Sequence, residues 1–308
     1  MKKPIIPNKF KARYSKILGI ENKEFLKYCS LPLRKCIRIN TLKVKDKERF
    51  IRRLKRKWKI ERVPFCDYAY FVNEEVELGK TEEYFLGKIY VQEAASLIPP
   101  IALSPTEKDF VLDCCAAPGS KTTQLAQIMN NRGCIVANDI NYKRIKSLRF
   151  NLELMGVMNT VVTKMDAIGF SKFQERFDKI LVDAPCSCEG IIRKNWNVLS
   201  RWSPKVIKYM SSQQKKILKS CLISLKKGGV LVYSTCTLAP EENEEVIDYA
   251  LKNFDLELEK IKIPGLKTRE GILEWEGKRF DKRVKRCARI WPQDNDTEGF
   301  FVAKLRKV

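Results

Sequence analysis

The hydrophobic and polar positions of this chain change pattern near residue 109. From there onward, short apolar runs alternate with longer segments whose apolar positions recur every three to four residues. Strands separated by helices in this order predict an α/β fold with a mainly parallel sheet. The expected strands span 109–114, 134–138, 159–164, 179–183, 229–234 and 300–305. The expected helices span 120–130, 141–155, 205–225 and 240–253.

The residues before this change predict a small α+β module over 1–88. Its clearest element is an amphipathic helix over 46–58, which Asp46 can cap at the N-terminus. We further expect a basic helical segment over 1–30, a strand over 36–44 and two short strands within 60–78.

Two further segments complete the expected domain organisation. Residues 89–106 are predicted as a linker helix that is interrupted at Pro99 and Pro100. Residues 107–308 are predicted as the larger domain, and the total of 308 residues suffices for one large core and one smaller domain.

Positive charge is concentrated at the N-terminus. The formal net charge is +23, and residues 1–62 hold 22 Lys and Arg against 5 Asp and Glu. The remainder holds 38 against 32. A basic excess gathered in one part of the chain indicates a face that binds a polyanion, with nucleic acid as the leading candidate. A solvated basic surface is the alternative, and a membrane surface is disfavoured because no basic amphipathic anchor stands out.

Other absences narrow the class of protein. The chain has neither an apolar run long enough to span a membrane nor the start of a signal peptide, so we expect a cytoplasmic protein. We also expect it to be a monomer. An odd number of cysteines, 11, predicts reduced thiols. The chain has no histidine, which excludes Ser-His-Asp triads, Cys-His dyads and histidine-containing zinc sites.

The stretch 109–127 predicts a ligand cradle. A buried strand ends at Asp113, a turn of small residues follows over 116–120, and a helix begins near Lys121. Backbone N–H groups at such a helix start can face a polar ligand. The stretch matches neither the Walker pattern nor GxGxxG, so a tight turn without a ligand remains an alternative.

Four carboxylates follow successive expected strands, at Asp113, Asp139, Asp166 and Asp183. Each alone could cap a helix or a turn. Together they meet at the carboxyl edge of a parallel sheet, where ligands bind, and Asp139 stands near the spacing at which an acid binds ribose. The four therefore favour a nucleoside cofactor. No dedicated phosphate loop is present, and Lys121 could neutralise one of the carboxylates.

Two cysteines follow strands that lead to the same edge. Cys186 lies after the strand at 179–183, and Cys236 lies after the strand at 229–234. A thiol at such a position can have a low pKa and act as a nucleophile. Cys186 and Cys188 also form a CxC pair, but we expect no metal because histidines and a matched CxxC are missing.

These segments resemble the Nop/Sun (RsmB-like) family of RNA cytosine-5 methyltransferases, most closely its archaeal tRNA-modifying members. The motif DxCAAPGGKT corresponds to residues 113–122, DxPCSG to 183–188, and STCT to 234–237. QEAxSxxPP corresponds to 92–100, and GFFxAxL to 299–305. The resemblance extends over nearly the whole chain and includes both cysteine motifs in order.

The resemblance implies a Rossmann-like fold of class I S-adenosylmethionine-dependent methyltransferases, with a mainly parallel seven-stranded sheet. It assigns Asp139 to the ribose with Arg144 nearby, Asp166 to the adenine amino group, and Asp183 to a place between cofactor and base. The loop that it implies for the cofactor consists of Cys115, Ala116, Ala117, Pro118, Gly119, Ser120 and Lys121. Two departures stand out, since Ser120 replaces a glycine and Cys188 stands where a small residue is usual.

The resemblance also implies the chemistry. The thiol of Cys236 adds to carbon 6 of cytosine, and Cys186 assists product release, with Asp183 supporting the ring nitrogen. The RNA would be tRNA, with rRNA as the alternative, and the basic module would hold its phosphates. Two other readings stay open: the cysteine roles could be exchanged, and the chain could be a non-catalytic RNA-binding or assembly protein.

Overall fold

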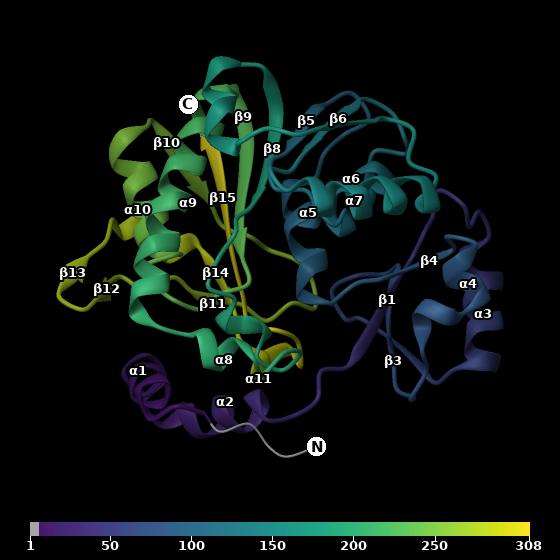
Figure 1. Cartoon of the computed structure of the whole chain (residues 1–308), viewed down its shortest axis with the longest axis horizontal. Helices are drawn as coiled ribbons and strands as arrows, with labels where there is room; N and C mark the ends of the chain where they lie inside the picture. The colour runs from purple at the N-terminus through teal and green to yellow at the C-terminus, as the bar shows by residue number, and fades with distance from the viewer. Residues whose placement is uncertain (1–5) are drawn as a thin grey trace.

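The computed structural model describes residues 6–308, so the first five residues of the predicted 1–30 segment and 1–88 module lie outside the described part. Figure 1 shows a large sheet with helices on both faces and a smaller sheet beside it. The large sheet contains β5 (Phe110–Asp113), β6 (Cys134–Asn138), β7 (Thr160–Thr163), β8 (Phe177–Asp183), β9 (Leu225–Thr235), β10 (Leu256–Glu259), β11 (Arg269–Glu270), β14 (Ala288–Ile290) and β15 (Phe300–Lys307).

The strand order of this sheet is β11-β14-β15-β9-β8-β5-β6-β7, with β10 also paired to β15. The five strands from β9 to β7 are parallel, and β15, β14, β10 and β11 pair antiparallel. The predicted α/β Rossmann-like fold is therefore confirmed. The predicted count of seven strands is wrong, because nine strands form the sheet within residues 6–308. The short β10, β11 and β14 extend it beyond the parallel part.

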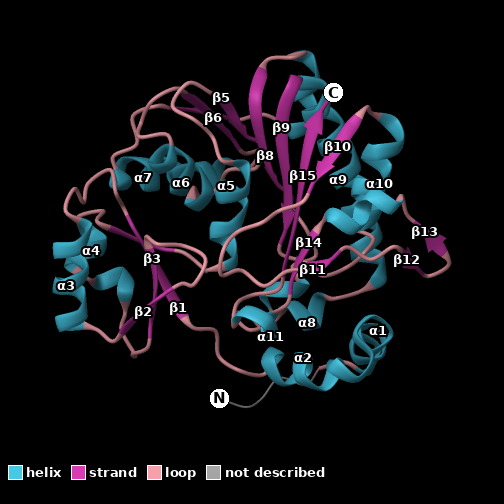
Figure 2. Ribbon diagram, turned by 180° about the vertical axis from the view of Figure 1, so that it is seen from behind, coloured by secondary structure: helices cyan, strands magenta, loops and turns pink. Residues whose placement is uncertain are grey.

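Helices cover both faces of the large sheet, as Figure 2 shows from behind. Successive side chains of β9 point to opposite faces: Val232 packs on one side, and Leu231 and Tyr233 pack on the other. The face of Val232 is covered by α5 (Ile98–Leu103), α6 (Ser120–Ile128) and α7 (Tyr142–Met155). The opposite face is covered by α9 (Pro204–Ser224) and α10 (Glu244–Asn253).

The small sheet has the order β2-β3-β1-β4, from β1 (Lys35–Ile39), β2 (Ile60–Arg62), β3 (Ala69–Val72) and β4 (Ile89–Val91). The predicted amphipathic helix is present as α3 (Lys47–Lys57), and the Asp46 side chain caps it by accepting a hydrogen bond from Arg49 N at 2.8 Å. Phe50 and Leu54 of α3 pack onto the sheet. The strand predicted over 36–44 ends at Ile39. The chain turns at Asn40, whose side-chain Nδ2 donates hydrogen bonds to Gly87 O and Met155 O.

The predicted linker helix over 89–106 is wrong in its first part. Residues 89–91 form β4, which pairs with β1 of the small sheet. Pro99 and Pro100 do not interrupt a helix but stand in the first turn of α5, where a missing N–H breaks no intrahelical hydrogen bond.

Helices α1 (Asn8–Leu18) and α2 (Asn22–Cys29) lie against the large domain and not against the small sheet. Phe10, Tyr14 and Phe25 form a cluster with Leu238 and Trp291. The N-terminal residues thus reach the loop that follows β9.

The remaining short elements connect these layers. They are α4 (Glu82–Phe85), α8 (Val198–Arg201), α11 (Pro292–Asn295), β12 (Glu274–Trp275) and β13 (Lys278–Arg279), together with the 3-10 turns η1 (Gly19–Glu21), η2 (Leu78–Lys80), η3 (Ala95–Leu97), η4 (Ala167–Lys172), η5 (Glu189–Ile191) and η6 (Lys282–Arg286). Within the described 6–308, no helix has the length and apolar character needed to cross a membrane.

Candidate active site

A cavity of about 320 Å³ opens at the carboxyl edge of β5, β8 and β9. The small sheet contributes β4 and the segment after it to the cavity wall, so the site lies between the two sheets. Its lining residues are Tyr90, Val91, Gln92, Glu93, Ser96, Asp113, Cys115, Ala116, Ala117, Pro118, Ser120, Lys121, Arg144, Asp183, Ile191, Lys194, Cys236, Glu298 and Phe300.

The loop between β5 and α6 is held close to its neighbours by its own backbone. Gly119 has φ of 107°, and a Cβ there would lie 3.0 Å from Leu148 Cδ1. A side chain at this position would therefore meet both a backbone and a packing conflict. Ala117 N donates to Asp139 Oδ2 at 3.2 Å, and Ala116 N donates to Asn138 O at 2.7 Å. These contacts fix the small residues along the cavity wall.

Lys121 and Asp183 form an ion pair of 2.7 Å across the cavity. Burial alone would lower the pKa of Lys121, but the facing Asp183 carboxylate outweighs it and raises that pKa. Lys121 Nζ also donates to Ser96 Oγ at 3.0 Å, and Ser234 Oγ donates to Asp183 Oδ1 at 2.8 Å. The carboxylate that Lys121 neutralises is therefore Asp183, which the sequence left open.

Asp113 lies fully buried beneath the loop, and Thr122 Oγ1 donates to its Oδ2 at 2.7 Å. Burial raises the pKa of Asp113 to about 7, with a further contribution from the charge of Asp183. Its Oδ1 has no hydrogen-bond partner within residues 6–308, although Asp113 lines the cavity. A buried carboxyl oxygen without a partner among the described residues thus lies next to the cavity.

The other two strand-end carboxylates lie outside the cavity lining. Asp139 is buried directly behind it, where it accepts from Ala117 N and lies 3.3 Å from Arg144 Nη1. Arg144 Nη2 also donates to Ala117 O. Asp166 is exposed, and its Oδ1 accepts from Ile168 N at 3.0 Å. The structure therefore brings together Asp113, Asp139 and Asp183, and it leaves Asp166 exposed and outside the cavity lining.

The predicted pair of cysteines does converge. The Sγ atoms of Cys186 and Cys236 are 3.3 Å apart, and Cys236 faces the cavity. Cys188 Sγ lies 3.9 Å from Cys186 Sγ. A hydrogen bond with Cys186 lowers the pKa of Cys236, but the hydrogen bond with Cys188, burial and the charge of Asp183 outweigh it and raise that pKa. The low thiol pKa considered from the sequence is therefore wrong for Cys236 in this state of the protein.

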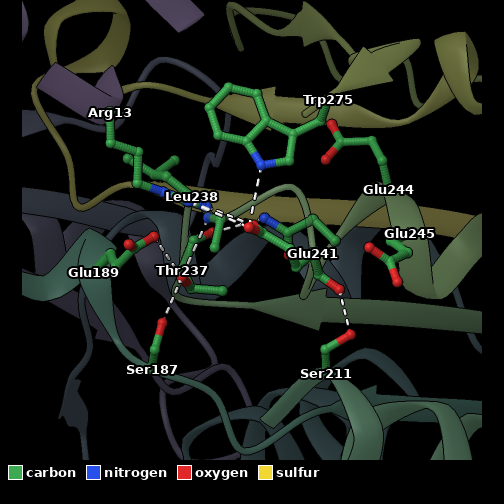
Figure 3. A network of polar contacts seen from close by, with 12 residues as sticks. Arg13, Ser187, Glu189, Ser211, Thr237, Leu238, Glu241, Glu244, Glu245 and Trp275 are labelled. Carbon is green, nitrogen blue, oxygen red and sulfur yellow. Dashed lines mark hydrogen bonds and ion pairs between the residues drawn. The ribbon is translucent and has the colours of Figure 1, made fainter. Parts of the chain in front are cut away.

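A buried carboxylate links the two cysteine loops, and Figure 3 shows part of its network. Glu189, after Cys188, accepts from Thr237 Oγ1 at 3.0 Å, and Ser187 and Thr237 share a hydrogen bond of 2.9 Å. Glu189 also accepts from Tyr14 Oη and Trp202 Nε1, each at 2.5 Å. The residues next to both cysteines are thus fixed to each other and to helix α1.

A second part of the same network holds the segment after Thr237 (Figure 3). Arg13 donates to both carboxylate oxygens of Glu241, with the shorter contact at 2.5 Å. Trp275 Nε1 donates to Glu241 Oε1 at 3.1 Å, and Ser211 Oγ donates to Glu241 O at 2.6 Å. The loop that carries Cys236 is therefore fixed by three distant parts of the chain.

Two carboxyl groups in the cavity were missed by the sequence reasoning. Glu93 accepts from Ser96 N and Glu298 N, and Glu298 is itself buried beside it. Burial and the charge of Glu93 raise the pKa of Glu298 to about 8. Neither residue follows a strand of the parallel sheet, so the strand-end criterion could not find them. Glu93 lies within the QEAxS motif segment, and Glu298 directly precedes the GFFxAxL segment, so these two motifs were the available signal.

A separate groove of about 640 Å³ runs along helix α3 on the small domain. Its lining is dominated by basic side chains, as the N-terminal charge excess predicted. The residues are Lys43, Val44, Lys45, Asp46, Arg49, Phe50, Arg52, Arg53, Arg56 and Lys88.

Comparison with protein families matches two models to this chain. The model described as 16S rRNA methyltransferase RsmB/F matches residues 100–306. The model described as the N-terminal domain of 16S rRNA methyltransferase RsmF matches residues 6–94. The two matches together extend over both sheets.

Similar curated proteins act on two kinds of RNA. The tRNA (cytosine(49)-C(5))-methyltransferase of Pyrococcus abyssi is 47% identical over 304 residues, which is 98% of this chain and 96% of that protein. The ribosomal RNA small subunit methyltransferase F of Shewanella piezotolerans is 42% identical over 298 residues, 92% of this chain. That match extends over only 60% of the Shewanella protein's own length.

Two solved structures are similar in fold over nearly the whole of this chain. A methyltransferase homolog from Pyrococcus horikoshii has a TM-score of 0.87 and 37% identity, over 96% of this chain and 94% of that chain. NSun6 from Pyrococcus horikoshii, solved with SFG, has a TM-score of 0.84 and 25% identity, over 98% of each chain.

Proposed function

This chain belongs to the RsmB/F methyltransferase family, and from this premise we propose that it transfers a methyl group from S-adenosylmethionine to carbon 5 of a cytosine in tRNA. The observation that favours tRNA over rRNA is the match to the Pyrococcus abyssi tRNA enzyme, which extends over 98% of this chain and 96% of that protein. The similar rRNA enzyme of Shewanella piezotolerans is matched over only 60% of its length. A cytoplasmic location and a monomeric state remain parts of the same proposal.

The lining of the cavity combines small residues and polar groups, which suits a polar ligand such as the methyl donor. The small residues 115–120 leave its wall open, and the unpartnered Oδ1 of Asp113 offers an acceptor there. In our proposal, the backbone of this loop and Lys121 hold the cofactor, and Asp139 with Arg144 binds the ribose. Asp166, which is exposed, binds the adenine amino group in the same proposal. When bound, S-adenosylmethionine supplies an electrophilic methyl group.

Carbon 5 of cytosine is a weak nucleophile, and the protein must activate it. We assign this task to Cys236, whose Sγ adds to carbon 6, so that the ring becomes an enamine and carbon 5 can accept the methyl group. The proton that leaves the Cys236 thiol passes by way of the Asp183 carboxylate, which Lys121 holds at 2.7 Å, to the ring nitrogen, so that no negative charge remains on the ring. A water molecule then takes the proton from carbon 5, the electron pair left behind re-forms the carbon 5–carbon 6 double bond, and the sulfur–carbon 6 bond breaks to release Cys236 as a thiolate.

We assign Cys186 to the release step. Its Sγ lies 3.3 Å from Cys236 Sγ, so it can pass a proton toward the departing sulfur. The raised pKa of Cys236 means that its thiol is protonated before the base binds. Loss of this proton therefore belongs to the step in which the base enters the cavity.

The basic groove along α3 provides the second half of the proposal, which is RNA binding. Lys45, Arg52 and Arg56 line a wide polar groove whose side chains suit phosphate groups. The cavity itself lies between the small and large domains, so a base must leave its stack to reach Cys236.

A methyl-transfer assay tests this proposal. The full chain is incubated with radiolabelled S-adenosylmethionine and separate tRNA and rRNA transcripts, and the product is digested to nucleosides. We expect label in 5-methylcytidine from tRNA, and none with the Cys236→Ala variant. Label confined to rRNA would overturn the choice of substrate. A folded protein that binds RNA but labels neither would support a non-catalytic RNA-binding protein.

A further inference from the structure

Three thiols converge at the rim of the cavity, one more than the proposed chemistry uses. Cys186 and Cys188 lie after β8, and Cys236 lies after β9. Their three Sγ atoms lie within 4.8 Å of one another, with Cys186 Sγ 3.3 Å from Cys236 Sγ and 3.9 Å from Cys188 Sγ. Within residues 6–308, no other three Cys, Asp or Glu residues converge in this way.

This spacing suits a metal ion. Zn²⁺ binds thiolates at about 2.3 Å in tetrahedral geometry, which separates neighbouring sulfur atoms by about 3.8 Å. The two separations from Cys186 Sγ lie close to that value and the third is within 4.8 Å, so side-chain rotations can place all three Sγ atoms around one ion. Cys236 faces the cavity and Cys188 is half-buried, which leaves an open side for entry and for a fourth ligand from solvent.

The backbone at Cys188 adopts a conformation that favours glycine. Its φ of 63° and ψ of 27° lie in the left-handed region, which glycine adopts freely and other residues adopt with strain. A glycine would satisfy this turn without strain. A strained side chain held beside a reactive centre is a reasonable starting point for a functional hypothesis.

We propose that Cys186, Cys188 and Cys236 form a trithiolate site for a soft divalent metal ion of the zinc group, and that its occupancy blocks methyl transfer. On binding, each thiol releases its proton to solvent and forms one sulfur–metal bond. No electron is transferred and no disulfide forms. The ion engages the Cys236 lone pair that would otherwise attack carbon 6. The binding claim rests on the thiol geometry, and the inhibition rests on the proposed function.

The chain offers a selective variant and a matched control. Cys188→Gly removes one ligand and relieves the left-handed backbone, and it leaves both Cys186 and Cys236 in place. Cys134→Ala removes a half-buried thiol on β6, outside the trio. Both variants therefore lose one of the 11 cysteines, but only the first changes the site.

The test uses the full chain, reduced with a phosphine and freed of metal by chelation. Cd²⁺ is titrated while sulfur-to-cadmium charge-transfer absorbance is recorded, and methyl transfer is then measured with and without Zn²⁺. We expect one Cd²⁺ per chain for the unchanged protein and for Cys134→Ala, with Zn²⁺ inhibition that a chelator reverses. For Cys188→Gly we expect retained methyl transfer, Cd²⁺ affinity lower by about 100-fold or more, and inhibition only at correspondingly higher Zn²⁺.

Equal Cd²⁺ affinity and absorbance in Cys188→Gly and the unchanged protein would overturn the site. Tight binding without inhibition would overturn the block and leave the site standing. The absorbance titration needs no RNA, so it decides the site even if methyl transfer fails in every variant and the proposed function falls.

Discussion

The substitution Tyr14→Phe removes the hydrogen bond from Tyr14 to Glu189 by deleting a single heavy atom, the hydroxyl oxygen. Tyr14 on α1 is fully buried, and its Oη donates to Glu189 Oε2 at 2.5 Å. Burial raises the pKa of Tyr14, so its hydroxyl stays protonated and continues to donate. Tyr14→Phe keeps the ring that packs 4.5 Å from Phe10 and 5.0 Å from Phe25, centroid to centroid, and deletes only this donor.

The expected cost follows from the charge and burial of the acceptor. A hydrogen bond to a charged group contributes roughly 1.5–3 kcal/mol to the free energy of unfolding. Glu189 still accepts hydrogen bonds from Trp202 Nε1 and Thr237 Oγ1 in the variant, so its carboxylate is not left without a partner. The loss of unfolding free energy therefore stays within that range. With an unfolding entropy of about 2.1 cal/mol/K per residue, 308 residues convert this loss into a Tm decrease of roughly 2–5 °C.

Differential scanning calorimetry of the full chain measures this decrease, with Tyr28→Phe as the matched control. Tyr28 lies on α2, where its ring faces Arg193 at 5.4 Å, outside the Glu189 network. We expect Tyr14→Phe alone to melt earlier and also to show slower methyl transfer, because Glu189 fixes the residue next to Cys236. Equal Tm and equal rate for the two variants would refute a structural connection between α1 and the cysteine loops.

Three further predictions concern charge. Lys121→Met leaves Asp183 without its counter-ion. In a single-turnover assay we expect methyl transfer to fall by at least about 100-fold. Lys121→Arg keeps a positive charge, so it should show only part of this loss. The double variant Arg52→Glu, Arg56→Glu removes two basic groups from the α3 groove. Filter binding across a salt series should then show a weaker RNA affinity that depends less steeply on salt concentration. The control Lys208→Glu, at an exposed position outside the groove, should leave both the affinity and its salt dependence unchanged. The pKa of Glu298 is raised to about 8 in the folded protein, so the unfolded chain loses this proton first as the pH rises. The free energy of unfolding should therefore fall between about pH 4.5 and pH 8. The Tm of Glu298→Gln, measured over the same range, should depend less on pH.

Where local signals and tertiary packing agreed, the sequence predicted the fold well. The helix over 46–58 was found because Asp46 caps it and its apolar face repeats at helical spacing, and the structure places α3 there. The strand predicted over 134–138 agrees with β6 at both ends. Residues 89–91 were assigned to a helix because nothing local shows that β1 pairs with them, which is a long-range contact.

The site was predictable to the extent that parallel strands bring their ends together. This rule brought Asp113, Asp183 and Cys236 to one cavity, as the structure bears out. It could not find Glu298, which precedes an antiparallel strand. Nor could it show that Cys188 joins the other two thiols, because that depends on the left-handed turn at this residue.

The covalent role of Cys236 is the central claim, and a trapped adduct tests it most directly. Cys186→Ala is incubated with tRNA and S-adenosylmethionine, denatured, and run on a gel beside the Cys186→Ala, Cys236→Ala double variant. We expect a denaturant-stable RNA–protein band with the single variant and none with the double variant. A band that persists without Cys236, or that forms with Cys236→Ala in place of Cys186→Ala, would contradict the assignment.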